Sequence, residues 1–329
     1  MKNPNAILLV ISFLFNITIV QASALERDEV RSFIDAMSEK HGFSTTDLNA
    51  IFQNVVFSDT VIDAISRPAE ALPWHKYRPL FLESARIQSG VVFWRNNRAS
   101  LAQAEEQFGV PAEILVAILG VETRYGKIKG KYAVINSLST LAFDYPKRSA
   151  FFLAELEQYL LLTREQGFDP MSLKGSYAGA MGIPQFVSSS YRNFAVDFDS
   201  DGVTDIWENP VDAIGSVGNY FRQHGWRTGE LIAEPAIVSG DKYKEMVSDE
   251  LKPGHSVQEL SEYDVTTKRR IAPDLLAKLL ILENADRNEY WLGFENFYVI
   301  TRYNHSALYS MAVFQLAREI KSRYLKGTD

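Results

Sequence analysis

An apolar helical stretch that carries an inward-facing glutamate sets the main requirement on the fold of this 329-residue chain. The segment AEILVAILGVETRYGK runs from Ala112 to Lys127 and has the periodicity of a largely buried helix. At about 100° per residue, Glu122 projects between Leu115 and Ile118 on the apolar face. Glutamate is almost never buried without a partner. The fold must therefore give this carboxylate either a partner or a chemical use.

The expected burial of Glu122 predicts a raised pKa, because leaving water disfavours the ionised carboxylate. A carboxyl group that keeps its proton near neutral pH can serve as a general acid. The alternative is a structural ion pair with Arg124 or Arg148, which would shift the pKa without any catalysis. The helix by itself does not separate these two interpretations.

An acidic segment, DFDSDGVTDIWE from Asp197 to Glu208, matches the calcium-loop pattern D-x-[DN]-x-[DN]-G-x₅-E at each specified position. Gly202 permits the sharp turn of such a loop. No second loop is present to pair with it, so the pattern favours one structural Ca²⁺. We expect no organic cofactor. The alternative is a solvated acidic turn. The expected ligands are Asp197, Asp199, Asp201, the Val203 carbonyl, Asp205 and Glu208.

The N-terminus has the pattern of an export signal. Lys2 precedes a mostly apolar run from Ile7 to Val20, and Ala22-Ser23-Ala24 offers small residues for cleavage. The chain has no cysteine, which excludes disulfides and a lipidated N-terminal cysteine. We therefore expect a soluble periplasmic protein without a stable membrane anchor; the alternative is an uncleaved signal anchor. The net charge of −7 argues against a nucleic-acid partner.

The composition changes along the chain and predicts its organisation. Helical periodicity dominates up to about residue 230, and the chain ends with an apolar helical face between Tyr309 and Tyr324. Between these regions, Ile232–Ser239, Val257–Val265 and Tyr290–Thr301 have strand-like composition, whereas Leu275–Ala285 is ambiguous between helix and strand. The expected regions are residues 1–24 (signal), 25–109 (helical), 110–230 (central), 231–301 (strand-rich) and 302–329 (C-terminal).

Two further segments could contact a ligand. GSYAGAMGIPQF, Gly175 to Phe186, would let a ligand approach the backbone closely, although Gly/Ala-rich loops are usually just tight connections. RYNHSALY, Arg302 to Tyr309, carries side chains suited to amide and sugar recognition, but a helix start explains Asn304 equally well. Neither segment is decisive alone.

Four motifs in order resemble the lytic murein transglycosylase B family of the lysozyme-like superfamily. They are GVETRYGK, GSYAGAMGIPQF, DFDSDGVTDIWE followed by NPVDAIGSVGNYFRQHGW, and RYNHSALYSMAV. The resemblance implies a mainly α (α+β) fold: a lysozyme-like core at 110–230 with a single EF-hand calcium loop, a flanking helical region and a small strand-rich region. Residues 302–329 would return to the cleft and the helical region.

The same resemblance implies a lytic transglycosylase that cleaves the MurNAc-GlcNAc β-1,4 bond of peptidoglycan and leaves 1,6-anhydro-MurNAc ends. Glu122 would be the sole general acid and base, because the substrate's N-acetyl group supports the reacting centre. Peptidoglycan glycan strands are the implied partner, and other cell-wall enzymes are candidate partners. The implied cleft residues are Ser176, Gln185, Tyr220, Tyr303, Asn304 and Tyr309, with Tyr77 and Arg148 as further candidates.

Two alternatives stay open at this point: a lysozyme-type muramidase, and a non-catalytic calcium-stabilised glycan-binding scaffold. Anhydro ends, reducing ends or intact glycan among the products would separate the three. The chain departs from the family pattern at Val187-Ser188, where Met-Pro is common, and at Asn209, which looks like an extra residue before Pro210.

Overall fold

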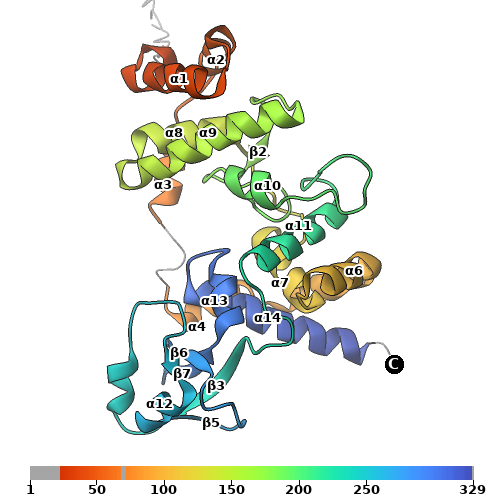
Figure 1. Cartoon of the computed structure of the whole chain (residues 1–329), viewed down its shortest axis with the longest axis vertical. Helices are drawn as coiled ribbons and strands as arrows, with labels where there is room; N and C mark the ends of the chain where they lie inside the picture. The colour runs from red at the N-terminus through yellow and green to blue at the C-terminus, as the bar shows by residue number, and fades with distance from the viewer. Residues whose placement is uncertain (1–22, 68–71, 328–329) are drawn as a thin grey trace, which may run out of the picture. The chain divides into compact units, whose positions relative to one another are not determined.

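The computed structural model describes residues 23–67 and 72–327, which form two compact units that divide after Val55 (Figure 1). The expected signal segment, residues 1–24, lies almost wholly outside the described residues. No helix in the described ranges has the length and hydrophobicity needed to cross a membrane. The region boundaries expected at residues 109, 230 and 301 stay predictions.

The first unit is helical and contains η1 (Ala24–Glu26), α1 (Asp28–His41) and α2 (Thr45–Phe52). Helix α1 buries Val30, Ile34 and Met37, which recur about once per turn on one face. It ends at Gly42, whose left-handed φ of 66° is typical of a helix C-cap. Ser44 then caps α2 through its hydroxyl group.

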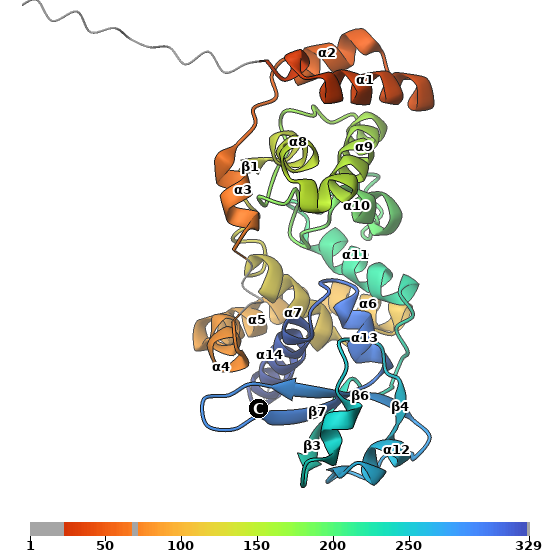
Figure 2. The ribbon, with the colours of Figure 1, turned by 90° about the vertical axis from the view of Figure 1, so that its left-hand side faces the viewer.

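Helix α7 (Ala112–Thr123) lies at the centre of the second unit and is buried along almost its whole length. It contacts α5, α6, α11 and α14, and Figures 1 and 2 show α14 alongside it. A helix enclosed in this way needs apolar residues on every side, which explains its composition. The helices of this unit are α3 (Asp59–Ile65), α4 (Trp74–Tyr77), α5 (Ser84–Asn96), α6 (Arg98–Phe108), α7, α8 (Val134–Asp144), α9 (Ser149–Gln166), α10 (Ser188–Phe194), α11 (Pro210–Gln223), α12 (Val257–Glu262), α13 (Glu295–Thr301) and α14 (Ala307–Lys326), with the 3₁₀ turns η3 (Arg78–Leu80), η4 (Pro146–Arg148) and η5 (Lys242–Met246).

The strand-rich region forms an antiparallel five-stranded sheet in the order β4-β6-β7-β3-β5. Figure 1 labels β5 and Figure 2 labels β4. A separate two-stranded ribbon pairs β1 with β2 near the cleft loops. The strands are β1 (Tyr132–Ala133), β2 (Lys174–Gly175), β3 (Ala233–Val238), β4 (His255–Ser256), β5 (Val265–Thr267), β6 (Leu276–Leu282) and β7 (Glu289–Gly293).

Strand β6 explains why its segment was ambiguous in the sequence. Leu280 and Leu282 pack into a core cluster with Trp74, whereas Ala277 and Leu279 pack into a second cluster. Alternate residues therefore face two different apolar cores. A strand buried on both faces loses the polar alternation by which a strand is usually identified.

Two segments with strand-like composition contain helices, which corrects those expectations. Val257 to Glu262 forms α12, whose Ser256 hydroxyl accepts from the Glu259 amide at 3.1 Å, as in a capping box. Glu295 to Thr301 forms α13, which buries Phe297 and Ile300 one turn apart. Here packing outweighs the strand preference of β-branched and aromatic residues.

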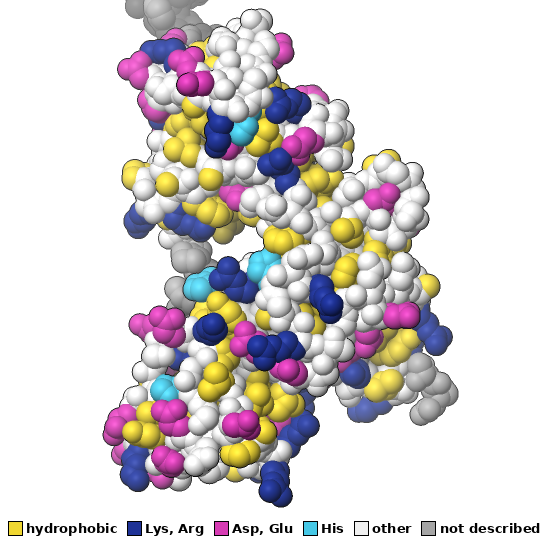
Figure 3. Space-filling model, viewed as in Figure 1, with side chains coloured by type: hydrophobic (Ala, Val, Ile, Leu, Met, Phe, Trp, Pro, Cys, Tyr) yellow, Lys and Arg dark blue, Asp and Glu magenta, His cyan; other side chains and the backbone are white. Residues whose placement is uncertain are grey.

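Charged side chains of both signs are intermixed on the face drawn in Figure 3. That face has no extended basic surface of the kind that binds polyanions by long-range attraction. Recognition of a ligand on it therefore depends on local contacts.

Candidate active site

A cleft of about 820 Å³ in the second unit brings together residues far apart in the sequence. Helices α7, α9, α10 and α11 contribute to its lining, together with the segments 176–187 and 301–305. Seven of the sequence-predicted site residues line it: Glu122, Arg148, Ser176, Gln185, Tyr220, Tyr303 and Asn304.

Glu122 is half-buried in the last turn of α7, and Tyr309 reaches it from the start of α14. The Tyr309 hydroxyl donates a hydrogen bond to Glu122 Oε1 at 2.5 Å. Burial, followed by the negative charge of Glu122, holds the pKa of Tyr309 well above its usual range. Tyr309 therefore keeps its proton and stays a donor to this carboxylate.

The chain turns sharply directly after Glu122. Arg124 and Tyr125 both have left-handed backbone conformations, with φ of 51° and 62°. Thr123 holds this turn, because its hydroxyl donates to the Ile183 carbonyl at 2.8 Å and accepts from the Gly126 amide at 2.9 Å. Strained non-glycine residues of this kind cluster at active sites. The turn fixes the position from which Glu122 enters the cleft.

The ion-pair alternatives for Glu122 are occupied elsewhere. Arg124 pairs with Glu83 at 2.7 Å. The Arg148 guanidinium lies over the rings of Phe151 and Phe152, 4.4 and 5.3 Å from their centroids. Glu122 accepts a hydrogen bond from the neutral Tyr309 hydroxyl, so the geometry favours the catalytic interpretation over a structural ion pair with either arginine.

Two tyrosines form one wall of the cleft. The hydroxyl of Tyr303 donates to the Pro184 carbonyl and that of Tyr220 to the Arg302 carbonyl, both at 2.5 Å. Their rings lie 4.9 Å apart and pack with Phe186. Because their hydroxyls bind the backbone, these side chains present ring surface, which suits the apolar faces of sugars.

Polar side chains within the Gly175–Phe186 segment fix its conformation through hydrogen bonds to the backbone. Ser176 Oγ accepts from the amides of Ala178 and Ala180 at 3.2 and 3.1 Å. Gln185 has φ of 54°, and its Nε2 donates to the carbonyls of Lys129 and Gly182. Both side chains therefore shape the loop that lines the cleft.

Tyr77 does not line the cleft. It is 1% exposed and belongs to the core cluster that includes Trp74, Met311 and Ala312. Its position places it beneath the start of α14, which carries Tyr309. The structure thus gives Tyr77 a supporting position, away from direct contact with a ligand in the cleft.

Sequence reasoning missed Glu155, a second carboxylate in the cleft lining. Glu155 is 5% exposed, and its two oxygens accept from the Ser189 amide at 2.9 Å and the Ser189 hydroxyl at 2.6 Å. A signal was available, because Glu155 falls on the same helical face as the buried Phe152 and Tyr159. This contact holds the first turn of α10, where Val187-Ser188 departs from the family pattern.

The acidic loop lies on the other side of the 176–187 segment from α7. Asp197 accepts from the amides of Asp201 and Gly202, and Asp205 accepts from those of Trp207 and Glu208. Carboxylate oxygens of Asp197, Asp199 and Asp212 lie within 4.8 Å of one another. Two oxygens that share a calcium ion at 2.3–2.6 Å can lie this far apart, so the donor set fits this ion.

Asp212 is an acidic residue of this group that the calcium pattern does not include. It is fully buried in the first turn of α11, and it accepts from the amides of Phe198 and Asp205, both at 2.7 Å. Burial raises the pKa of Asp212, and the charges of Asp199 and Asp197 raise it further. Asn209, the extra residue, caps α11 and donates to Asp199 at 2.9 Å.

Hydrogen bonds connect the acidic loop to the turn after Glu122. Ile206 accepts through its carbonyl from the Ile183 amide at 2.8 Å, and the Ile183 carbonyl accepts from Thr123. In parallel, Lys129 Nζ donates to the Trp207 carbonyl at 2.9 Å and forms an ion pair with Glu208. A change in the loop can therefore reach the position of Glu122 through two short paths.

The chain matches a known family and a known protein over most of its length. Residues 26–318 match the family model described as the transglycosylase SLT domain. The chain is 40% identical over 306 residues to membrane-bound lytic murein transglycosylase B of Escherichia coli (strain K12). That match covers 88% of this chain and 82% of the relative.

Solved structures of lytic transglycosylases are also similar to this chain over most of its length. Soluble lytic transglycosylase SltB1 from Pseudomonas aeruginosa is 48% identical with a TM-score of 0.84, covering 90% of this chain and 99% of that one. Escherichia coli Slt35 in complex with calcium is 41% identical with a TM-score of 0.83, covering 91% and 94%. SltB3 from Pseudomonas aeruginosa, solved with NAG-NAM-pentapeptide, is 30% identical with a TM-score of 0.77, covering 89% and 79%.

Proposed function

The chain belongs to the transglycosylase SLT domain family and is a lytic transglycosylase, and we propose that Glu122 breaks the glycosidic bond of its peptidoglycan substrate. The observation that carries this assignment is the Glu122–Tyr309 hydrogen bond inside the 820 Å³ cleft. This bond orients the carboxyl group beside a neutral donor, which supports the proposal that the glycan strand lies next to it. The fold supports a lysozyme-like enzyme of mainly helical structure with a small sheet.

The reaction needs one proton that leaves Glu122 and returns to it. Protonated Glu122 donates to the bridging oxygen of the MurNAc-GlcNAc bond while the bond from the MurNAc anomeric carbon to that oxygen breaks. The substrate's own N-acetyl group supports the electron-poor centre. Ionised Glu122 then takes the proton of the C6 hydroxyl, whose oxygen bonds to the anomeric carbon and closes the 1,6-anhydro ring. Tyr309 stabilises the ionised form that this second step requires.

The second carboxylate of the cleft supports a mechanism with a single acid and base. Standard retaining and inverting glycosidases use two carboxyl groups, one on each side of the bond. Both oxygens of Glu155 are engaged by Ser189, which leaves this group as a structural cap for α10. Glu122 is therefore assigned both roles.

The remaining cleft residues bind the strand in this proposal. Tyr220 and Tyr303 offer ring surface, and Gln185, Ser176 and Asn304 also line the cleft. Arg148 lines the α9 side.

Mass spectrometry of digested peptidoglycan tests the assignment. The wild-type chain should yield 1,6-anhydro ends, and Glu122→Gln should lower their rate of formation by roughly 10²–10⁴-fold, as expected for loss of a general acid. Glu113→Gln is the matched control, because Glu113 lies on the same helix and pairs with Lys321 at the surface. Products with ordinary reducing ends would instead show a hydrolase. Near-normal turnover by Glu122→Gln would reject its role.

A structural calcium ion in the acidic loop is part of the same proposal. Slt35 was solved in complex with calcium, and the carboxylates here have a compatible spacing. Carboxylate oxygens of Asp197 and Asp199 lie within 4.8 Å of those of the buried Asp212. Asp201, Asp205 and Glu208 lie outside this cluster, and with the Val203 carbonyl they would complete the shell of the ion. When bound, the ion supplies positive charge that offsets the repulsion among these carboxylates. It takes no part in the reaction.

Export to the periplasm is the remaining part of the proposal. Its support is the signal pattern that ends at Ala22-Ser23-Ala24. N-terminal sequencing of the protein from fractionated cells should find a chain that begins near Leu25 in the periplasmic fraction. An intact N-terminus recovered with membranes would contradict this.

A further inference from the structure

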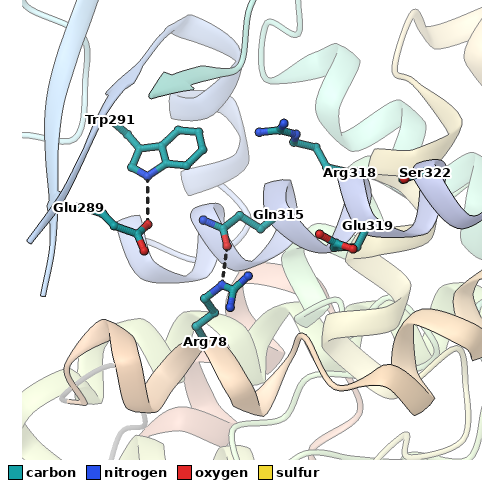
Figure 4. A pocket seen from close by; sticks show the side chains of 7 residues that line it. All are labelled: Arg78, Glu289, Trp291, Gln315, Arg318, Glu319 and Ser322. Atoms are coloured by element: carbon teal, nitrogen blue, oxygen red, sulfur yellow. Dashed lines mark hydrogen bonds between the residues drawn. The ribbon is translucent and has the colours of Figure 1, made fainter. Parts of the chain in front are cut away.

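A second hollow of about 480 Å³ lies between α14, β7 and the turn η3 (Figure 4). It shares no lining residue with the cleft of Glu122. Trp291 of β7 is 8% exposed and contributes an apolar wall. Four charged side chains surround it: Arg78, Arg318, Glu289 and Glu319. We call this hollow the α14 pocket.

The α14 pocket faces away from the catalytic cleft. Tyr309 and Arg318 belong to the same helix, and Arg318 follows nine residues later. Nine residues rotate a helix by about half a turn beyond two full turns and advance it by about 13 Å. Since Tyr309 points to Glu122, Arg318 points to the opposite side. A ligand in this pocket is therefore a different group from the sugars beside Glu122.

Both arginines of the α14 pocket are held in place without being neutralised. Arg78 Nε donates to Gln315 Oε1 at 2.7 Å, and the Arg318 guanidinium lies 5.7 Å from the centroid of the Phe314 ring. Within the described ranges, neither forms an ion pair with an acidic residue. Their remaining N–H groups can bind carboxylates, for which a guanidinium has matching geometry.

The α14 pocket also carries two carboxylates, which can bind cationic groups of a ligand. Glu289 accepts from Asn284 Nδ2 at 2.7 Å and, over a longer distance of 3.4 Å, from Trp291 Nε1. Glu319 is exposed and has no hydrogen-bond partner in the part of the chain that the structure describes. Cationic and anionic groups thus border one small hollow with an indole wall. This arrangement fits a short ligand that carries both free carboxylates and a free ammonium group.

We propose that the α14 pocket binds the peptide stem of a peptidoglycan strand other than the one that Glu122 cleaves. Arg78 and Arg318 would bind the stem carboxylates, Glu319 its free ammonium group, and Trp291 its small apolar side chains. The proposal rests on the proposed function, because it takes peptidoglycan as the substrate. SltB3 was solved with a ligand that includes a pentapeptide, which shows that a relative binds peptide-bearing glycan. Contact with a neighbouring strand would hold the enzyme on cross-linked wall.

Calorimetric titration with a synthetic stem pentapeptide, free of glycan, tests the pocket. Arg318→Gln should weaken binding about tenfold or more, since it removes a charge-assisted hydrogen bond to a carboxylate. Arg164→Gln is the matched control, because Arg164 is an exposed arginine on α9 outside both sites. Acetylating the amino groups of the peptide should also weaken binding to the wild-type chain. Absent binding, or equal affinity of Arg318→Gln and the wild type, would overturn the proposal.

Steady-state kinetics distinguish a role of the α14 pocket from the function of the cleft. On cross-linked peptidoglycan, Arg318→Gln should raise KM severalfold and leave kcat and the anhydro products unchanged. If the wild-type chain releases no anhydro ends, the proposed function fails. The pocket proposal is then still decided by the peptide titration, which measures whether binding depends on Arg318. If kcat falls and KM does not change, Arg318 acts on the fold or on the cleft, and the pocket proposal fails.

Discussion

Two effects act on the Glu122 carboxyl in opposite directions. Its partial burial disfavours the ionised form, and the hydrogen bond from Tyr309 favours it. A group that must first donate and then accept a proton needs both forms to be accessible. The neighbouring Tyr303 and Tyr309 keep their protons, since burial and the charge of Glu122 raise the pKa of both hydroxyls.

Tyr309→Phe is predicted to shift this balance toward the protonated form of Glu122. The substitution removes the donor and keeps the ring, so we expect kcat to fall about tenfold, the equivalent of one lost hydrogen bond to a charged group. The alkaline limb of the kcat/KM pH profile should move to higher pH, because the proton of Glu122 is then lost less readily. Tyr303→Phe is the control, since its hydroxyl binds the Pro184 carbonyl. A profile that does not move would show that Tyr309 acts only on packing.

At this scale the helical pattern predicted Glu122, whereas Tyr309 was expected in the cleft only through the family resemblance and not as the partner of Glu122. The helical periodicity placed Glu122 on the buried side of α7, but its partner is 187 residues away. Contacts between such distant residues follow from the packing of α14 on α7, which no local pattern encodes. Asp212 was missed for a related reason. Its position in the first turn of a helix is ordinary, and only its burial beside Asp197 and Asp199 marks it.

At the scale of elements, the acidic loop and the turn after Glu122 behave as one connected structure. The Ile206–Ile183–Thr123 hydrogen bonds cross the 176–187 segment, and Lys129 joins the same loop from the other side. Lys129 also brings a positive charge to Glu208, the last expected calcium ligand. The ammonium group and a bound cation would therefore compete for this carboxylate.

Lys129→Met is predicted to raise the calcium affinity of the loop severalfold. The change removes a cation next to the ion site and frees Glu208, while the backbone carbonyl that binds Gln185 remains. Without calcium, the lost ion pair with the exposed Glu208 should cost no more than about 1 kcal/mol of unfolding free energy, and the lost hydrogen bond to the Trp207 carbonyl about 1 kcal/mol more. Calcium titration followed by calorimetry measures the first effect. Lys127→Met, an exposed lysine nearby, is the control, and equal affinities for all three proteins would contradict the competition.

Helices were predicted where apolar residues recur with helical spacing, and element types were mispredicted where packing decides. The periodicity of α7 and α14 was sufficient. By contrast, β6 has apolar residues on both faces, and α13 forms from β-branched and aromatic residues that also occur in strands. The start of α12 could have been found, since Ser256 and Glu259 have the spacing of a capping box.

At the scale of the molecule, the chain divides after Val55 into two units of very different size. The sequence did not predict this boundary, because residues on both sides of it have helical periodicity and no change in composition marks the junction. The first unit has a small core formed by few side chains, including Ile34, Met37 and Phe52. So small a core buries little apolar surface, so this unit should be the less stable of the two.

Calcium should stabilise only the larger unit, which contains the acidic loop. Binding to the folded state adds RT ln(1 + [L]/Kd), about 2.7 kcal/mol at a calcium concentration 100 times the dissociation constant. Hydrogen exchange followed by mass spectrometry should show slower exchange in α7 and α11 with calcium than with chelator, and no change in α1 and α2.

Magnesium should replace calcium poorly, because it requires a stricter octahedral shell. Glu208→Gln should remove much of the gain, and Glu230→Gln, a surface change outside the loop, should keep it. Exchange that is the same with chelator, calcium and magnesium would mean that the loop is an acidic turn that binds no ion.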